Sequence, residues 1–158
     1  MPVRALIGLG ANLGQARETI ERALEALKST SGIEALEVAP FYGSDPVDAK
    51  GPTFVNTVAR IQTHLAPLAL LEVLQALERE HGRERTFRNA PRTLDLDLLW
   101  YEEITMETAR LTLPHPRMHE RAFVLKPLND LMPELVLKQG NIAQLLAQCS
   151  DQKLWPIE

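Results

Sequence analysis

Two aspartates, Asp95 and Asp97, alternate with leucines in a stretch whose period of two indicates a β-strand. Side chains two positions apart in a strand point to the same face, so the two carboxylates share one face. Their spacing of roughly 6–7 Å, from the rise per residue of a strand, suits two hard cations bridged by substrate oxygens better than a shared proton. The alternative is a strand with one solvated face, because charged side chains are normally at the surface. We favour the metal site, because the apolar continuation at Leu98 and Leu99 indicates a central strand, where buried carboxylates need partners.

A cluster of arginines precedes the two aspartates. Arg83, Arg85, Arg88 and Arg92 lie within ten residues of one another. Such a run is usually a solvated loop. Here it leads directly into the aspartate strand, and guanidinium groups beside metal-binding carboxylates are the combination that handles polyphosphates. The sequence therefore favours a polyphosphate substrate over a merely solvated loop.

Two further polar residues have both a structural and a functional interpretation. Asn56 stands near the start of an alternating stretch at 54–63, where it is either an edge residue or an amide that hydrogen-bonds a ligand. His115 stands between Pro114 and Pro116, where it is either part of a rigid turn or an imidazole whose direction the prolines set. Both alternatives stay open from the residues alone.

Hydrophobic periodicity predicts four strands and two helices, followed by C-terminal additions. Short strands within 104–113, a helix over 117–131 that Pro127 interrupts, and a last helix at 141–149 form the additions. Asn12 is able to cap the first helix. The order strand–helix–strand, twice, predicts an α+β fold of the ferredoxin-like split βαβ plan, with a mainly antiparallel sheet and the helices on one face. The strands are expected at 3–9, 33–42, 54–63 and 94–101, and the helices at 15–28 and 68–81.

Composition narrows the class of protein. A length of 158 residues predicts one domain over 1–158 with a substantial core. The net charge of −4 and the aromatic content of 5% argue against a nucleic-acid-binding module and against binding to anionic membranes. The single cysteine, Cys149, excludes an internal disulfide and a cysteine metal cage. No signal peptide or membrane span stands out, so we expect a cytoplasmic protein.

The stretch 88–99, with the sequence RNAPRTLDLDLL, resembles the signature of the 6-hydroxymethyl-7,8-dihydropterin pyrophosphokinase family. The likeness extends over nearly the whole chain, and the blocks in this order are more specific than any one of them. The chain departs from the family pattern at Asn89 and Pro116, where tryptophan and tyrosine are frequent, so no aromatic contact is expected there. The other matching blocks are 10–14, 41–42, 54–56, 111–118 and 121–124.

The resemblance implies a reaction and its substrates. The family transfers a diphosphate from ATP to the hydroxymethyl group of 6-hydroxymethyl-7,8-dihydropterin in folate biosynthesis and releases AMP. It implies two Mg²⁺ ions, a monomer, small-molecule substrates, and neither nucleic acid nor membrane as a partner. The alternative is a catalytically idle relative that only binds the pterin or a nucleotide.

The resemblance also assigns roles to individual residues. Catalytic roles fall to Arg83, Arg92, Asp95 and Asp97, of which the two aspartates are the metal ligands. Contacts with ATP fall to Gln75, Glu78, Arg85, Arg88, Arg92, Leu98, Arg110, Thr112, His115 and Arg121. Contacts with the pterin fall to Ser44 and Val47 through their backbones, and to Phe54, Asn56, Asp95 and Phe123.

Overall fold

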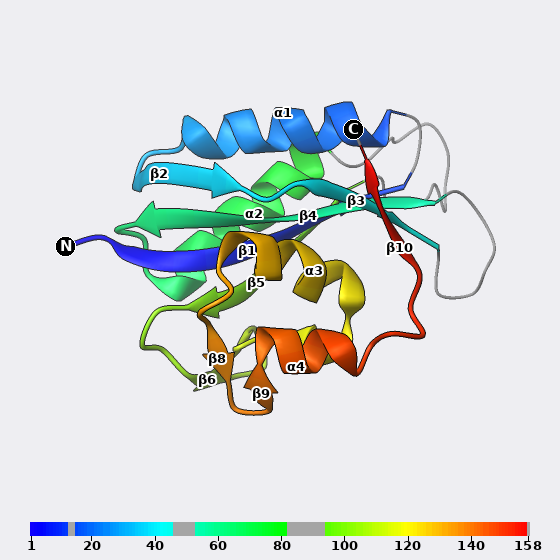
Figure 1. The fold of residues 1–158 in the computed structure, drawn as a ribbon. Helices are drawn as coiled ribbons and strands as arrows, with labels where there is room; N and C mark the ends of the chain where they lie inside the picture. Colours follow the sequence, from blue (N-terminus) through cyan, green and yellow to red (C-terminus); the bar gives the residue numbers. More distant parts are fainter. Residues whose placement is uncertain (13–14, 46–52, 82–93, 158) are drawn as a thin grey trace.

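The structure is a computed structural model that describes residues 1–12, 15–45, 53–81 and 94–157. Figure 1 shows a sheet between two layers of helices, with the C-terminal strand β10 beside β3 at one edge. The elements in chain order are β1 (Val3–Ala11), α1 (Ala16–Lys28), β2 (Ile33–Val38), β3 (Phe41–Ser44), β4 (Phe54–Thr63), α2 (Pro67–His81), β5 (Asp95–Tyr101), β6 (Met106–Glu107), β7 (Thr112–Leu113), the 3₁₀ helix η1 (Met118–Glu120), α3 (Ala122–Leu131), β8 (Val136–Leu137), β9 (Gly140–Asn141), α4 (Ile142–Ala147) and β10 (Leu154–Ile157).

One antiparallel sheet carries the candidate site. Its strands lie in the order β10, β3, β4, β1, β5, and β2 pairs with β4 beyond β3 along the same edge. β1 pairs with β4 on one side and with β5 on the other. It therefore lies between Asn56 of β4 and the two aspartates of β5. The predicted antiparallel sheet is confirmed.

The stretch predicted as one strand at 33–42 is two strands. β2 ends at Val38 and β3 begins at Phe41, because Pro40 has no N–H to donate to a neighbouring strand. The Thr57 hydroxyl of β4 spans the break by donating to the carbonyl oxygens of Ala39 and Pro40, at 3.0 and 3.1 Å. β3 then continues to Ser44, which brings that residue into the sheet.

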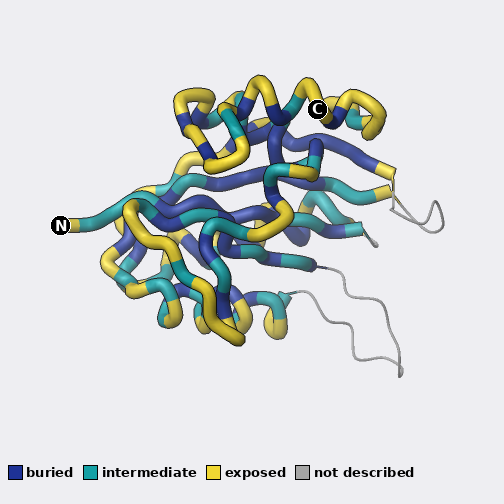
Figure 2. Tube along the Cα trace, turned by 90° about the horizontal axis from the view of Figure 1, so that it is seen from below, coloured by how far each residue is buried: buried dark blue, intermediate teal, exposed yellow. Residues whose placement is uncertain are grey.

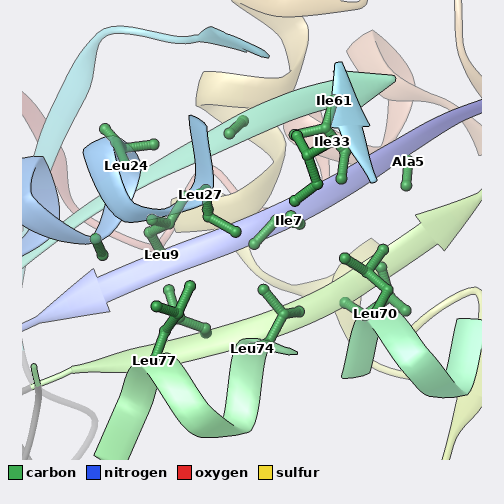
Figure 3. Packing of buried hydrophobic residues seen from close by; sticks show 14 of the residues in the cluster. Ala5, Ile7, Leu9, Leu24, Leu27, Ile33, Ile61, Leu70, Leu74 and Leu77 are labelled. Atoms are coloured by element: carbon green, nitrogen blue, oxygen red, sulfur yellow. The ribbon is translucent and has the colours of Figure 1, made fainter. Parts of the chain in front are cut away.

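The helices α1 and α2 cover one face of the sheet. Both lie within one residue of their predicted bounds, and α1 uses Gln15 rather than Asn12 as its N-cap, without a side-chain hydrogen bond. Burying a leucine side chain stabilises the fold by about 1.5–3 kcal/mol, so this face supplies much of the stability. Figure 3 shows the packing, in which the apolar stripes of the helices meet β1 through Leu24, Leu27, Leu70, Leu74, Leu77, Ile7 and Leu9.

The helices α3 and α4 cover the opposite face, where a second core forms around Leu6, Val58 and Leu99. The two crossover helices therefore share one face as predicted, and the C-terminal helices, for which no face was predicted, cover the other. β1 is buried on both faces, which explains why its residues 5–9 are continuously buried rather than alternating. Figure 2 shows this arrangement as dark central strands between helices whose outer surfaces are exposed.

The C-terminal part differs from the expected elements in three ways. The predicted helix from 117 is η1 followed by α3, with extended backbone at Arg121 between them. Pro127 lies inside α3 and is buried rather than ending the helix. The strands β8, β9 and β10 were not predicted, because strands of two to four residues are too short for a periodic pattern. Within the described ranges, no helix is long and apolar enough to cross a membrane.

Candidate active site

Asp95 and Asp97 lie on the same face of β5, as the alternation predicts. Leu96 and Leu98 between and beyond them are 5% and 3% exposed and belong to the core under α1 and α2. The two aspartates are half-buried and therefore point to the other face of the sheet. Leu99, two residues after Asp97, lies on the same face and belongs to the second core. A bulge follows, since Ile7 pairs with Leu98 and Leu6 with Trp100, so that Trp100 also packs against the second core.

β5 is the last strand on its side of the sheet and not a central one, so that prediction is wrong. The outer edge of β5 is nevertheless occupied. The Leu96 N–H donates to Glu78 Oε2 of α2 at 2.8 Å, and the Leu99 carbonyl accepts from His115 N–H at 2.7 Å. Two residues assigned to the ATP site, Glu78 through its carboxylate and His115 through its backbone, are thus held against the backbone of the aspartate strand.

Two glycines of β1 separate the aspartates from β4. Gly8 pairs with Asp97, and Gly10 pairs with Asp95 on one side and with Asn56 on the other. Neither glycine puts a side chain between the carboxylates and the amide. A Cβ atom on Gly10 would lie 3.0 Å from Asn56 Oδ1, so the amide leans over this glycine.

The amide of Asn56 is fixed by a buried hydroxyl. Asn56 is 5% and Ser44 6% exposed, and Asn56 Nδ2 donates to Ser44 Oγ at 2.8 Å. Ser44 pairs with Phe54 across β3 and β4, which places all three side chains on the face of Asp95. Three residues assigned to the pterin site are therefore brought together, with the amide oxygen directed toward Gly10.

A polar cluster anchors α3 to β3 next to this amide. The Tyr42 phenol donates to the Asp130 carboxylate, whose other oxygen lies 3.4 Å from Lys126 Nζ. Lys126 Nζ is also 5.8 Å from the centre of the Tyr42 ring. Burial first, and then the hydrogen bond and charge of Asp130, raise the pKa of Tyr42 to about 12, so the phenol keeps its proton. Tyr42 pairs with Asn56 across the sheet. Its hydrogen bond to Asp130 therefore holds α3 against the part of the sheet that carries Asn56.

The start of α3 contributes Arg121 and Phe123, and the guanidinium carbon lies 5.6 Å from the centre of the Phe123 ring. His115 is close enough to Asp97 and Arg121 for their charges to change the pKa of its imidazole. Burial lowers the pKa of His115, the Asp97 charge opposes this, and Arg121 and Arg117 lower it further. His115 is therefore neutral at neutral pH. Its Nδ1 accepts from Arg117 N–H at 3.1 Å, which leaves the proton on Nε2 as a donor.

The remaining described residues of the assigned ATP site lie on α2, on β5, on β7 and between β6 and β7. Arg110 forms an exposed ion pair with Glu72 of α2 at 3.5 Å, and Gln75 is exposed on the same helix. Thr112 is half-buried in β7. The Leu98 side chain points into the core, so only its backbone can meet a ligand. The residues Val47, Arg83, Arg85, Arg88 and Arg92 lie outside the described residues.

A profile of the 7,8-dihydro-6-hydroxymethylpterin-pyrophosphokinase (HPPK) family matches residues 6–133. The chain belongs to the HPPK family. It is 48% identical over 148 residues to a 2-amino-4-hydroxy-6-hydroxymethyldihydropteridine pyrophosphokinase of Pseudomonas aeruginosa, covering 92% of this chain and 91% of the relative. It is 41% identical over 154 residues to the enzyme of the same name from Haemophilus influenzae, covering 96% of each.

The fold agrees with solved structures of HPPK proteins. A crystal structure of an HPPK-DHPS protein in complex with substrates superposes with a TM-score of 0.75 at 13% identity. The superposition covers 93% of this chain and 43% of that chain, so this chain spans less than half of the two-part protein. At this identity the likeness concerns the fold alone.

The acidic pair fits the metal that the HPPK family implies. Asp95 and Asp97 present carboxylates on one face, and carboxylate oxygens are the ligands that Mg²⁺ prefers. Mg²⁺ usually keeps several waters and binds through one or two carboxylates and substrate phosphates, so a pair of aspartates is a sufficient protein contribution.

Sequence reasoning missed the residues that position the site rather than touch a ligand. The expected first strand ends at residue 9, whereas β1 continues to Ala11 and so includes both Gly8 and Gly10, which leave one face of the strand without side chains. Tyr42 and Asp130 are 88 residues apart, and no local pattern joins them.

Proposed function

We propose that this protein transfers a diphosphate group from ATP to the hydroxymethyl group of 6-hydroxymethyl-7,8-dihydropterin and releases AMP, as a step of folate biosynthesis. The observation that carries the proposal is the pairing of Gly10 with both Asp95 and Asn56. It puts the carboxylate of Asp95, and with it that of Asp97 two residues on, on the same face as a fixed, buried amide. The names of the relatives from Pseudomonas aeruginosa and Haemophilus influenzae support the same reaction.

The pterin is expected to lie against Asn56. A flat heterocycle with donors and acceptors on its edge needs an in-plane amide and aromatic faces. The amide is available, because Ser44 uses only one of its N–H groups. Phe54, two residues before Asn56 in β4, and Phe123, in α3, are both half-buried. The backbones of Ser44 and Val47, and the Asp95 carboxylate, complete the proposed pterin contacts.

The polyphosphate is expected to lie along β5. Asp95 and Asp97 would hold two Mg²⁺ ions, which neutralise phosphate charge when bound. Neutral His115 offers its Nε2–H, and Arg121 its guanidinium, as donors to phosphate oxygens. Arg83 and Arg92 are proposed to steady the transferring phosphates. The other proposed ATP contacts are Gln75, Glu78, Arg85, Arg88, Leu98, Arg110 and Thr112.

The finer fold class is also a proposal. The strand order β5, β1, β4, then β2 and β3, with α1 and α2 as the two crossover helices, supports the ferredoxin-like split βαβ plan with C-terminal additions. A single domain over 1–158, a monomeric state and a cytoplasmic location stay predictions.

The function is tested by incubating the protein with Mg²⁺, ATP and 6-hydroxymethyl-7,8-dihydropterin and separating the nucleotides by chromatography. We expect AMP that depends on the pterin. ADP in its place would indicate an ordinary kinase, and no nucleotide product would favour the idle binding relative. A reaction without pterin is the control for hydrolysis.

Gly10→Ala should raise the dissociation constant of the pterin by about 3- to 10-fold, because the added methyl group displaces the amide oxygen of Asn56. Gly8→Ala is a matched control in the same strand. Its Cβ would meet Leu99 at 3.4 Å, an ordinary contact, so pterin affinity should stay within about twofold. Calorimetric titration of both variants measures the difference. Equal losses would disprove the role given to Gly10.

A further inference from the structure

One side chain from the C-terminal segment holds both peptide groups of Arg121. Gln152 Oε1 accepts from Ala122 N–H at 2.9 Å, and Gln152 Nε2 donates to the Glu120 carbonyl at 2.8 Å. The Glu120 carbonyl belongs to the peptide before Arg121, and the Ala122 N–H to the peptide after it. Rotation of the backbone about Arg121 would break one or both of these hydrogen bonds.

The helix that Arg121 begins has no cap of its own. Arg121 is the N-cap of α3, has extended backbone with φ −115° and ψ 110°, and makes no side-chain cap hydrogen bond. The first N–H groups of a helix have no partner within the helix and are normally satisfied by a Ser, Thr, Asp or Asn at the N-cap. Here Gln152, 30 residues further along, supplies an acceptor.

The position of Gln152 is itself fixed on both sides. Its N–H donates to the Cys149 carbonyl at 2.9 Å. Two residues later β10 begins, with Leu154 paired to Ser44 and Trp155 to Gly43 of β3 (Figure 1). The Trp155 indole lies directly over Gly43, where a Cβ atom would come within 2.4 Å of the ring nitrogen. The segment is therefore anchored to the sheet independently of α3.

The backbone direction at Arg121 decides where its charge lies. The Arg121 side chain is half-buried and lies over the Phe123 ring, so it is packed rather than freely extended into solvent. A guanidinium binds a phosphate more tightly when the chain around it is already ordered, because less conformational entropy is lost on binding. By fixing the peptide groups before and after Arg121, Gln152 therefore also fixes the position of the Arg121 guanidinium.

We propose that Gln152 is a positioning residue that holds Arg121 in place for the polyphosphate of the nucleotide. The inference rests on the proposed function, and Gln152 lies beyond the residues 6–133 that the family profile matches. Gln152 acts through the two peptide groups and does not touch the substrates. Its effect therefore depends on the Arg121 side chain being present.

A double-mutant cycle tests this dependence. Gln152→Met keeps the length of the side chain and removes both hydrogen bonds, which should lower kcat/KM for ATP, measured as AMP formed, about 3- to 10-fold. In an Arg121→Ala background the same change should alter kcat/KM by no more than about twofold. Gln152→Glu keeps an acceptor for Ala122 N–H and should lie between Gln152→Met and the wild type. The control is Gln148→Met, on an exposed glutamine whose side chain has no hydrogen bond to any described residue.

Thermal melts of all variants are recorded beside the kinetics. Equal losses of kcat/KM in both backgrounds would mean that Gln152 only stabilises the fold and would overturn the proposal. An unchanged kcat/KM for Gln152→Met, or a Gln152→Glu variant no better than it, would do so as well. Wild-type protein that forms no AMP would instead contradict the proposed function.

Discussion

Asp95→Asn and Asp97→Asn should each lower AMP formation about 100-fold or more, because each removes a negatively charged oxygen ligand from the proposed metal site. The fold should survive, since both carboxylates are on the face of β5 away from the core around Leu96 and Leu98. Replacing one carboxylate by an amide also relieves repulsion between like charges, so the change in melting temperature should be small.

The two aspartates are best compared across a series of Mg²⁺ concentrations. Loss of a metal ligand predicts that part of the activity returns at high Mg²⁺, whereas loss of a purely structural residue does not. Glu107→Gln in β6, which removes an exposed carboxylate, is the control and should leave the rate unchanged. Near-normal AMP formation by both aspartate variants at ordinary Mg²⁺ would disprove the metal assignment.

Asn56→Ala should weaken pterin binding by roughly 1–3 kcal/mol, or about 5- to 150-fold, while nucleotide affinity changes little. The variant removes the one buried amide of β4, and it also leaves the buried Ser44 hydroxyl without its donor. Some loss of stability is expected for that second reason. Calorimetry with the pterin and, separately, with a non-hydrolysable ATP analogue measures both affinities.

A matched amide on the same strand distinguishes a site effect from a strand effect. Gln62→Ala removes an exposed amide six residues further along β4 and should leave both affinities unchanged. Phe123→Ala on α3 should resemble Asn56→Ala in direction, because it removes an aromatic face from the opposite side of the proposed slot. Equal losses of pterin and nucleotide affinity in Asn56→Ala would contradict a separate pterin site.

Features that depend on short stretches of chain were predictable. The shared face of Asp95 and Asp97 follows from the period of two alone. The bounds of α1 and α2 follow from apolar stripes within single helices. The resemblance at 88–99, together with the other matching blocks in the same order, indicates the family, and the family profile over residues 6–133 agrees with it.

The position of β5 in the sheet could not be predicted this way. Its apolar continuation at Leu98 and Leu99 indicated a central strand, yet β5 ends the sheet. The apolar run has another cause, since Leu98 faces the core under α1 and α2 and Leu99, on the face of the aspartates, meets the core of α3 and α4. A sequence pattern reports that a side chain is buried and does not report which element buries it.

The residues that position the candidate site do so through contacts between distant parts of the chain. Gly10 matters because β1 happens to lie between Asp95 and Asn56, and Gln152 matters because the chain returns to α3 after α4. The sequence by itself determined the acidic pair, the two first helices and the family. Only the tertiary structure decided which residues stand beside that pair, because hydrogen bonds across 30 or 88 residues leave no periodic trace in the chain.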